Sequence, residues 1–238
     1  MAKSKNVERK AKIEQLRREQ QRKERRRSMA ILGACGVVVV ALLAAALIPY
    51  ISNLRKDDEL RNTALTKLGV PAASAGCAPI KKQDAKGGGQ HVTPPTPIKY
   101  DSAPPAFGKH WGNFLTGSEI RPFYTVDDRP EIERLVHSLE HGHTIIWYDD
   151  TVKKGTADYD ALEAISTKLG SSSYVMVAPW TKDDGASFPS GKHIALTHWT
   201  GPQDQKGIWQ YCTKASGPVV QKFDKDYPKD NAPEPGAA

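Results

Sequence analysis

Two histidines and a carboxylate stand close together in residues 135–142, which read LVHSLEHG. On a helix, side chains four positions apart are neighbours, so His137 and His141 would direct two imidazoles to one place, with Glu140 beside them. Imidazoles and carboxylates bind transition metals, and they also serve as general acids and bases. The segment therefore predicts either a metal site or an acid–base site.

Further histidines precede this segment, in and just after a stretch that predicts no regular structure. Residues 81–105 contain three consecutive glycines and five prolines, with His91 among them and His110 shortly after. Zinc usually has four ligands, with Zn–N distances of about 2.0–2.1 Å, and imidazole-rich sets suit copper equally well. We therefore predict a Zn or Cu site whose ligands are His137, His141, His110 and His91, with Glu140 in a supporting role.

Two other functions of the segment stay open at this stage. The histidines could form hydrogen bonds that fasten the proline-rich loop to the helix end, where histidines also favour the helix dipole. The order His-x-x-Glu-His is also that of inverted zinc proteases, in which Glu140 would be the general base on a metal-bound water. Glu163 is then the candidate third ligand, but a five-residue match arises easily by chance. We therefore expect a protein that is not an enzyme, with a zinc-dependent hydrolase as the minor alternative.

A short helix must position the His-Glu-His set. Pro130 and Glu131 predict its start and Gly142 its end. Its apolar residues, from Ile132 to Leu139, recur at i, i+3, i+4 and i+7, which marks the face that packs on the core. At about 100° per residue, both histidines and the glutamate fall about 80–180° from that face. We therefore expect the three side chains to lie off the buried stripe.

The remaining segments of the outer part predict alternating strands and helices. Strands are expected at 143–148, 174–180 and 194–200 and near 123–126, and helices at 157–169 and within 219–227. The resulting order, β-α-β-α-β-β-α, is that of a thioredoxin-like domain, and it favours an α/β layer arrangement. No Cys-x-x-Cys is present, so this order carries no dithiol chemistry. We predict a single α/β (mixed α+β) domain.

The first sixty residues predict where the protein resides. Residues 1–28 hold twelve Lys or Arg against four Glu, and the following 23 residues, 29–51, carry no charge. About 20 apolar residues span a bilayer as a helix, so residues 29–51 predict an uncleaved transmembrane helix. Arg25, Arg26 and Arg27 precede it, whereas Asp57, Asp58 and Glu59 follow it. The positive-inside rule then places the N-terminus in the cytoplasm and the C-terminal part outside the cell membrane.

These segments divide the chain and indicate its partners. The basic tail is expected to contact the lipid bilayer through anionic headgroups, at about 1 kcal/mol for each basic residue near the surface. Nucleic-acid binding is not expected, because no aromatic residue or motif accompanies the charge. The predicted divisions are a basic cytoplasmic tail (1–28), a transmembrane helix (29–51), a stalk (52–76), an extracytoplasmic globular domain (77–228) and a disordered tail (229–238).

The three cysteines divide by position. Cys35 lies within the apolar segment and is expected to be a small apolar residue there. Cys77 and Cys212 lie in the part expected outside, where an oxidising setting permits a disulfide. We predict this disulfide, and the alternative is that one of the two cysteines is a metal ligand.

The sequence resembles a bacterial family of unknown function, many of whose members are actinobacterial. The resemblance rests on the pattern Pro-Pro-x-x-Gly-x-His-Trp at 104–111, on LVHSLEHG at 135–142, and on a strand that ends in Tyr148. It covers most of residues 77–234, including His91 and the Pro-Glu pair at 233–234. The resemblance implies a membrane-anchored protein with its domain outside, and it implies no reaction. Ala106 and Phe107 depart from the family pattern, as does His198, which makes His198 a weaker candidate for a shared site.

A further function that the sequence allows is docking. The protein could be a non-enzymatic envelope protein that binds another membrane protein, with His137, Glu140 and His141 structural. Five tryptophans in one small domain could include exposed anchors, although aromatic residues are more often buried in a core.

Overall fold

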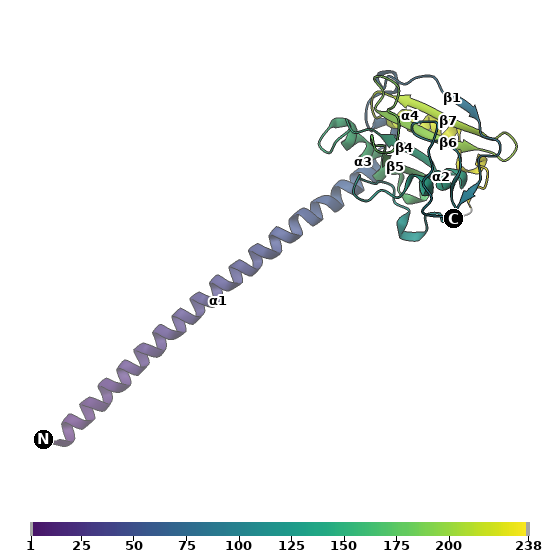
Figure 1. The fold of residues 1–238 in the computed structure, drawn as a ribbon. Helices are drawn as coiled ribbons and strands as arrows, with labels where there is room; N and C mark the ends of the chain where they lie inside the picture. The colour runs from purple at the N-terminus through teal and green to yellow at the C-terminus, as the bar shows by residue number, and fades with distance from the viewer. Residues whose placement is uncertain (1, 237–238) are drawn as a thin grey trace. The chain divides into compact units, whose positions relative to one another are not determined.

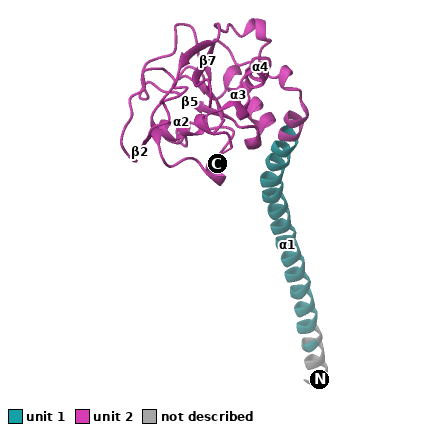
Figure 2. Cartoon of the chain, turned by 90° about the vertical axis from the view of Figure 1, so that its right-hand side faces the viewer, with its two compact units in different colours: residues 1–56 teal, residues 57–238 magenta. Residues whose placement is uncertain are grey.

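The computed structural model describes residues 2–236, which divide into two compact units (Figure 2). Residues 1–56 form the first unit and residues 57–238 the second. Each unit is described by itself below.

A single long helix, α1 (Ala2–Asn62), accounts for the first unit, and its last residues fall within the range of the second. The 23 uncharged residues 29–51 lie within it, and at 1.5 Å per residue they extend about 34 Å, enough to cross a hydrocarbon core of about 30 Å. The apolar side chains of this segment are exposed, as in Leu32 (70%) and Val37 (71%). A buried helix of a soluble core would hide such side chains. By its length and composition, α1 is a helix that could cross a membrane.

The second unit is built around a five-stranded sheet (Figure 1). Its order is β1-β7-β6-β4-β5, in which β4 and β5 are parallel and every other neighbouring pair is antiparallel. A separate parallel pair, β2 and β3, completes the strands of the described residues. The strands are β1 (Lys81–Asp84), β2 (His91–Val92), β3 (His110–Trp111), β4 (Thr144–Tyr148), β5 (Val175–Pro179), β6 (Ile194–Thr200) and β7 (Lys206–Cys212), and the helices are α2 (Ile132–Glu140), α3 (Ala157–Leu169) and α4 (Gly217–Asp226).

Alternation along the strands gives the sheet two buried faces. In β4, Ile146 and Tyr148 point to one core, whereas Ile145 and Trp147 point to the other. Helices α3 and α4 cover the first face, and α2 covers the second with Leu135, Val136 and Leu139. Each buried Leu or Val contributes about 1.5–3 kcal/mol relative to leaving it exposed. The apolar stripe of α2 therefore fixes that helix on the second face and sets the direction of its remaining side chains.

The mixed α/β class predicted from the sequence is confirmed, with differences in its elements. The expected strand at 123–126 is only one isolated bridge, between Phe123 and Val177. Four observed strands, β1, β2, β3 and β7, were not predicted. The first is entirely polar, the next two have two residues each, and the alternation of β7 is interrupted by polar residues and by Gly207. The thioredoxin-like order predicted above thus differs from the observed order in these places.

The predicted stalk and C-terminal tail also differ from the structure. Leu65 and Leu68 are buried in the first core, so packing of the domain begins well before residue 77. The segment expected to be a disordered tail, residues 229–238, is described to residue 236 and makes backbone hydrogen bonds with the domain. It begins with a 3-10 turn (Lys229–Asn231), and Ala232 is fully buried. Low hydrophobicity suggested disorder, but hydrogen bonds between this segment and the rest of the domain order it.

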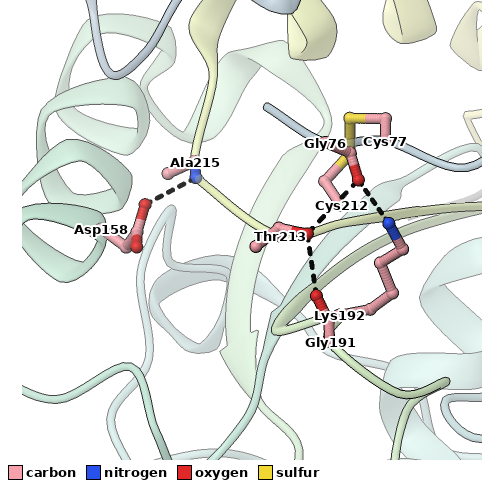
Figure 3. Close-up of a disulfide and its surroundings, with 8 residues drawn as sticks. All are labelled: Gly76, Cys77, Asp158, Gly191, Lys192, Cys212, Thr213 and Ala215. Atoms are coloured by element: carbon pink, nitrogen blue, oxygen red, sulfur yellow. Dashed lines mark hydrogen bonds between the residues drawn. A yellow bond between two sulfur atoms is a disulfide. The ribbon is translucent and has the colours of Figure 1, made fainter. Parts of the chain in front are cut away.

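Cys77 and Cys212 form a disulfide, the pair that the sequence favours (Figure 3). The bond joins the segment just before β1 to the end of β7, across 135 positions of the chain. Next to it, the carbonyl of Gly76 accepts hydrogen bonds from the side chains of Lys192 and Thr213. The disulfide thus lies in a region where three distant segments meet.

Candidate metal centre

Three segments bring four ligand groups together on the second face of the domain. The parallel pairing of β2 with β3 places His91 opposite His110. Helix α2 packs against β3 and contributes His137 and Glu140. One ligand atom from each of the four residues lies within 4.8 Å of the others. This spacing is close enough for one metal ion to be held after small side-chain adjustments.

The contacts within the group centre on the Glu140 carboxylate. The Oε2 atom of Glu140 is 3.0 Å from Nε2 of His110 and 3.6 Å from Nε2 of His91. In a tetrahedral zinc site, ligand atoms about 2.0–2.1 Å from the metal are about 3.3 Å apart. The ring centroids of His110 and His137 are 4.5 Å apart, and that of His91 is 4.8 and 4.9 Å from them. The two N–O separations, 3.0 and 3.6 Å, therefore bracket the spacing of ligand atoms in such a coordination shell.

Backbone carbonyls orient two of the imidazoles. The Nδ1 atom of His110 is 2.9 Å from the carbonyl oxygen of Gly108, and Nδ1 of His137 is 2.6 Å from that of Trp111. Because a carbonyl only accepts, Nδ1 carries the proton in each neutral ring, and the lone pair is on Nε2. A backbone carbonyl behind a histidine is the usual support of a metal-ligating imidazole. Both histidines thus have the tautomer that a metal ion requires.

The facing atoms of His110 and Glu140 are buried without a hydrogen bond within the part of the chain that the structure describes. Neither Nε2 of His110 nor Oε2 of Glu140 makes an aligned hydrogen bond in the described residues, although both atoms are buried. Two lone pairs 3.0 Å apart repel each other unless a proton or a cation lies between them. The arrangement therefore favours a bound cation or a protonated imidazole.

Burial sets the charges of the group. His110, His137 and Glu140 are at most 4% exposed, whereas the side chain of His91 is 53% exposed. Burial, with a smaller contribution from the neighbouring histidines, lowers the pKa of His137 to about 4, although the hydrogen bond to the carbonyl of Trp111 opposes the shift. Burial raises the pKa of Glu140, but its contact with His110 and the neighbouring imidazoles more than offset this, so the pKa is lowered. At neutral pH a neutral His137 lies beside an ionised carboxylate, a combination that suits a divalent cation.

A glycine allows the backbone before β2 to pass close to this carboxylate. A Cβ atom on Gly89 would collide with Oε1 of Glu140. The glycine run at 87–89, which the sequence marks only as a loop, thus has a specific position at the centre. Larger residues at 89 would displace the carboxylate.

The expectation that the His-Glu-His set lies off the buried face needs correction. His137, Glu140 and His141 do lie away from the apolar stripe of α2, yet each is at most 5% exposed. The β2–β3 segment and the C-terminal segment cover them; for example, the backbone N–H of Glu234 donates to the carbonyl of Glu140. Helical periodicity cannot reveal a cover supplied by distant irregular segments.

His141 belongs to a neighbouring group instead of the predicted four-histidine set. Its ligand atom lies with those of Glu140 and Glu234, and its ring stacks on Phe114 at 5.3 Å. Glu140, predicted in a supporting role, is shared by both groups. Glu234 was missed as a site residue, and the Pro-Glu pair of the resemblance was its only signal. Glu163 is exposed on α3, whose apolar face packs on the opposite side of the sheet, so it does not join either group.

His198 lies outside both groups and has a structural role. Its Nε2 is 2.8 Å from Oδ1 of Asn231, to which it donates, and its Nδ1 is 3.0 Å from the hydroxyl of Thr144, from which it accepts. The neutral ring is therefore satisfied at both nitrogens. Burial lowers the pKa of His198 to about 4.

This burial predicts a loss of stability in acid. Between about pH 6.5 and pH 4 the unfolded chain binds a proton at His198 and the folded chain does not, so stability falls as pH falls. A shift of this size corresponds to about 3 kcal/mol, at 1.36 kcal/mol for each pKa unit. Urea unfolding, followed by tryptophan fluorescence from pH 7.5 to 4.5, should show a flatter pH dependence in His198→Gln than in the parent. Equal slopes for the two proteins would contradict this assignment.

Comparison with known proteins gives a family but no described activity. A search of curated proteins and a search of solved structures returned no match. One family model, described as "Protein of unknown function (DUF3105)", matches residues 91–238. The matched region begins at His91 and includes every residue of the two ligand groups. Because the match covers more than half of the chain, the protein belongs to this family of unknown function.

Proposed function

We propose that the protein is a single-pass membrane protein whose extracytoplasmic domain binds one transition metal ion, Zn or Cu, through His91, His110, His137 and Glu140. The observation that carries this proposal is the meeting of buried His110 Nε2 and Glu140 Oε2 at 3.0 Å, without an aligned hydrogen bond. A cation replaces that repulsion with two attractive contacts.

The ligand set favours binding over catalysis. Three imidazoles and one carboxylate fill the four positions of a tetrahedral zinc site, whereas a catalytic zinc keeps one position for water. A cavity of about 440 Å³ beside Tyr148 and Tyr159 is lined by none of the four ligands. The exposed ligand His91 gives an ion a route in and out. A metal-binding protein that is not an enzyme therefore accounts best for the geometry.

The location is part of the proposal. Helix α1 is long and apolar enough to cross a membrane, and arginines precede its uncharged segment whereas acids follow it. The positive-inside rule then supports a cytoplasmic N-terminus, with its basic residues near anionic lipid headgroups, and a metal centre outside the cell membrane.

Metal content of the full chain tests this function. Protein purified in detergent, stripped with a chelator and dialysed against Zn²⁺ or Cu²⁺, should retain metal and unfold at a higher temperature than the stripped protein. The stabilisation arises because an ion that binds only the folded state shifts the folding equilibrium. His137→Ala should retain less metal, and His193→Ala, which changes a histidine outside the centre, should match the parent. Absence of metal above background in the parent would contradict the proposal.

The alternative is a docking protein in which His137, Glu140 and His141 are structural. The hydrogen bond from His137 to the carbonyl of Trp111 favours a fastening role, since it joins α2 to β3 without a metal. Docking through tryptophan anchors receives no support, because all five tryptophans are at most 8% exposed. In the described part of the second unit, Val126 alone is an exposed large hydrophobic residue.

A further inference from the structure

A second group of ligand atoms lies directly against the proposed centre. Glu140, His141 and Glu234 each offer one ligand atom, and these atoms lie within 4.8 Å of one another. Glu140 also belongs to the first group, so the two groups share one carboxylate. A carboxylate has two oxygens with about four lone-pair positions, and it can therefore serve two cations at once.

The imidazole of His141 is buried without a hydrogen-bond partner. The residue is 5% exposed, and neither Nδ1 nor Nε2 has a partner in the described residues. A buried polar group without a partner loses its hydrogen bonds to water on folding and gains none in return. Phe114 stacks on one face of the ring, with an interplanar angle of 27°, so it covers the ring without satisfying the nitrogens. A cation bound to one nitrogen would satisfy it.

The backbone holds Glu234 in place, although its side chain reaches solvent. Its N–H donates to the carbonyl of Glu140 at 3.0 Å, and the N–H of Gly236 donates to that of His141 at 3.2 Å. The segment fits because Gly142 has a φ of +98°, and a Cβ at this position would collide with the carbonyl of Lys229. The C-terminal segment is thus fixed against the end of α2, beside the ligands.

We propose that Glu140, His141 and Glu234 bind a second divalent transition metal ion, and that Glu140 bridges it to the first. This inference rests on the proposed function, because the bridge requires an ion in the first group. Metal ions in two-metal sites lie about 3.5–4 Å apart. One imidazole and two carboxylates form a harder ligand set than the first group, and Zn²⁺ suits both. The exposed Glu234 makes the second ion the weaker and more exchangeable of the two.

The number of Zn²⁺ ions bound by each chain tests the inference. Metal-free full chain in detergent should bind two Zn²⁺ in equilibrium dialysis, in two steps of different affinity. Glu234→Gln and His141→Ala should each weaken the second step by on the order of 100-fold, with the first step changed less than about threefold. Asp230→Asn changes another acid of the same exposed segment and should bind two ions like the parent. Glu234→Gln changes an exposed side chain, so it remains informative even if His141→Ala fails to fold.

The possible stoichiometries separate this inference from the proposed function. No bound Zn²⁺ in the parent, together with no bound Cu²⁺ in the test of the proposed function, would overturn both. One Zn²⁺ in the parent, unaffected by Glu234→Gln, would support the first centre and overturn the second. Two Zn²⁺ in the parent that both persist in Glu234→Gln and His141→Ala would overturn the assignment of these residues. Loss of only the weaker step in both variants would support the bridged pair.

Discussion

Glu140→Gln is expected to weaken metal binding by the full chain by about 100- to 1000-fold. A structural zinc ion contributes about 10–16 kcal/mol through four ligands, so one ligand accounts for about 2.5–4 kcal/mol. At 1.4 kcal/mol for each factor of ten, this corresponds to the stated range. Glutamine retains the size of the side chain but loses its negative charge. Competition with a chelator of known affinity measures the change.

Glu163→Gln is the matched control for this substitution. Glu163 is exposed on α3, on the other side of the sheet, and its change should leave metal affinity unaltered. A weaker affinity in Glu163→Gln would favour the inverted zinc-protease arrangement over the proposed centre. Unchanged binding in Glu140→Gln would show that the carboxylate is not a ligand. The stripped Glu140→Gln protein should remain folded, since an amide avoids burying a charge.

Removal of the Cys77–Cys212 disulfide should lower the free energy of unfolding by about 5 kcal/mol at 25 °C. The bond closes a loop of 135 positions in the unfolded chain. In the chain-entropy model, breaking it raises the conformational entropy of the unfolded state, which lowers the free energy of unfolding by this amount. Domains of this size are stable by only about 5–15 kcal/mol, so the loss is a large share of the total. Urea unfolding of Cys77→Ala/Cys212→Ala, followed by tryptophan fluorescence, measures it, because all five tryptophans lie buried in the second unit.

Single substitutions distinguish the effect of losing the disulfide bond from the effect of replacing the packed cysteine side chains. Cys77→Ala alone breaks the same bond and should lose nearly as much stability as the double variant. Cys35→Ala changes an exposed cysteine of α1 and should leave the unfolding curve unaltered. Equal stability of the oxidised parent and Cys77→Ala would contradict the prediction.

Local sequence patterns predicted the local elements well. The stripe from Ile132 to Leu139 gave the position of α2 to within a few residues, and strand β6 was predicted with its observed bounds, 194–200. Such elements are determined by hydrophobic periodicity, which a single sequence displays. Strand β1 could not be predicted in the same way, because its four residues are polar and exposed and it exists only by pairing with β7.

The candidate centre was predicted in part for the same reason. His137 and Glu140 share one helix, so spacing alone associates them. The pairing of His91 with His110 depends on β2 and β3, two-residue strands that no periodicity reveals. The second group of ligand atoms, with His141, also includes Glu234, which backbone hydrogen bonds hold against the end of α2 although it lies nearly one hundred residues further along the chain. Contacts between distant segments determine which of several plausible ligands meet.

In the second unit, segments near its beginning pack against segments near its end. This arrangement has a consequence for biosynthesis. Leu65 packs in the same core as Val219, β1 pairs with β7, and the segment after Lys229 lies against α2. A ribosome must therefore release residues up to about 230 before all of these contacts can form. Native contacts between distant residues also make folding slow, because loops must close before the contacts stabilise them. Under the proposed topology, the domain would pass the membrane unfolded, and the segment after Lys229 would cover α2 only once the rest of the domain has emerged.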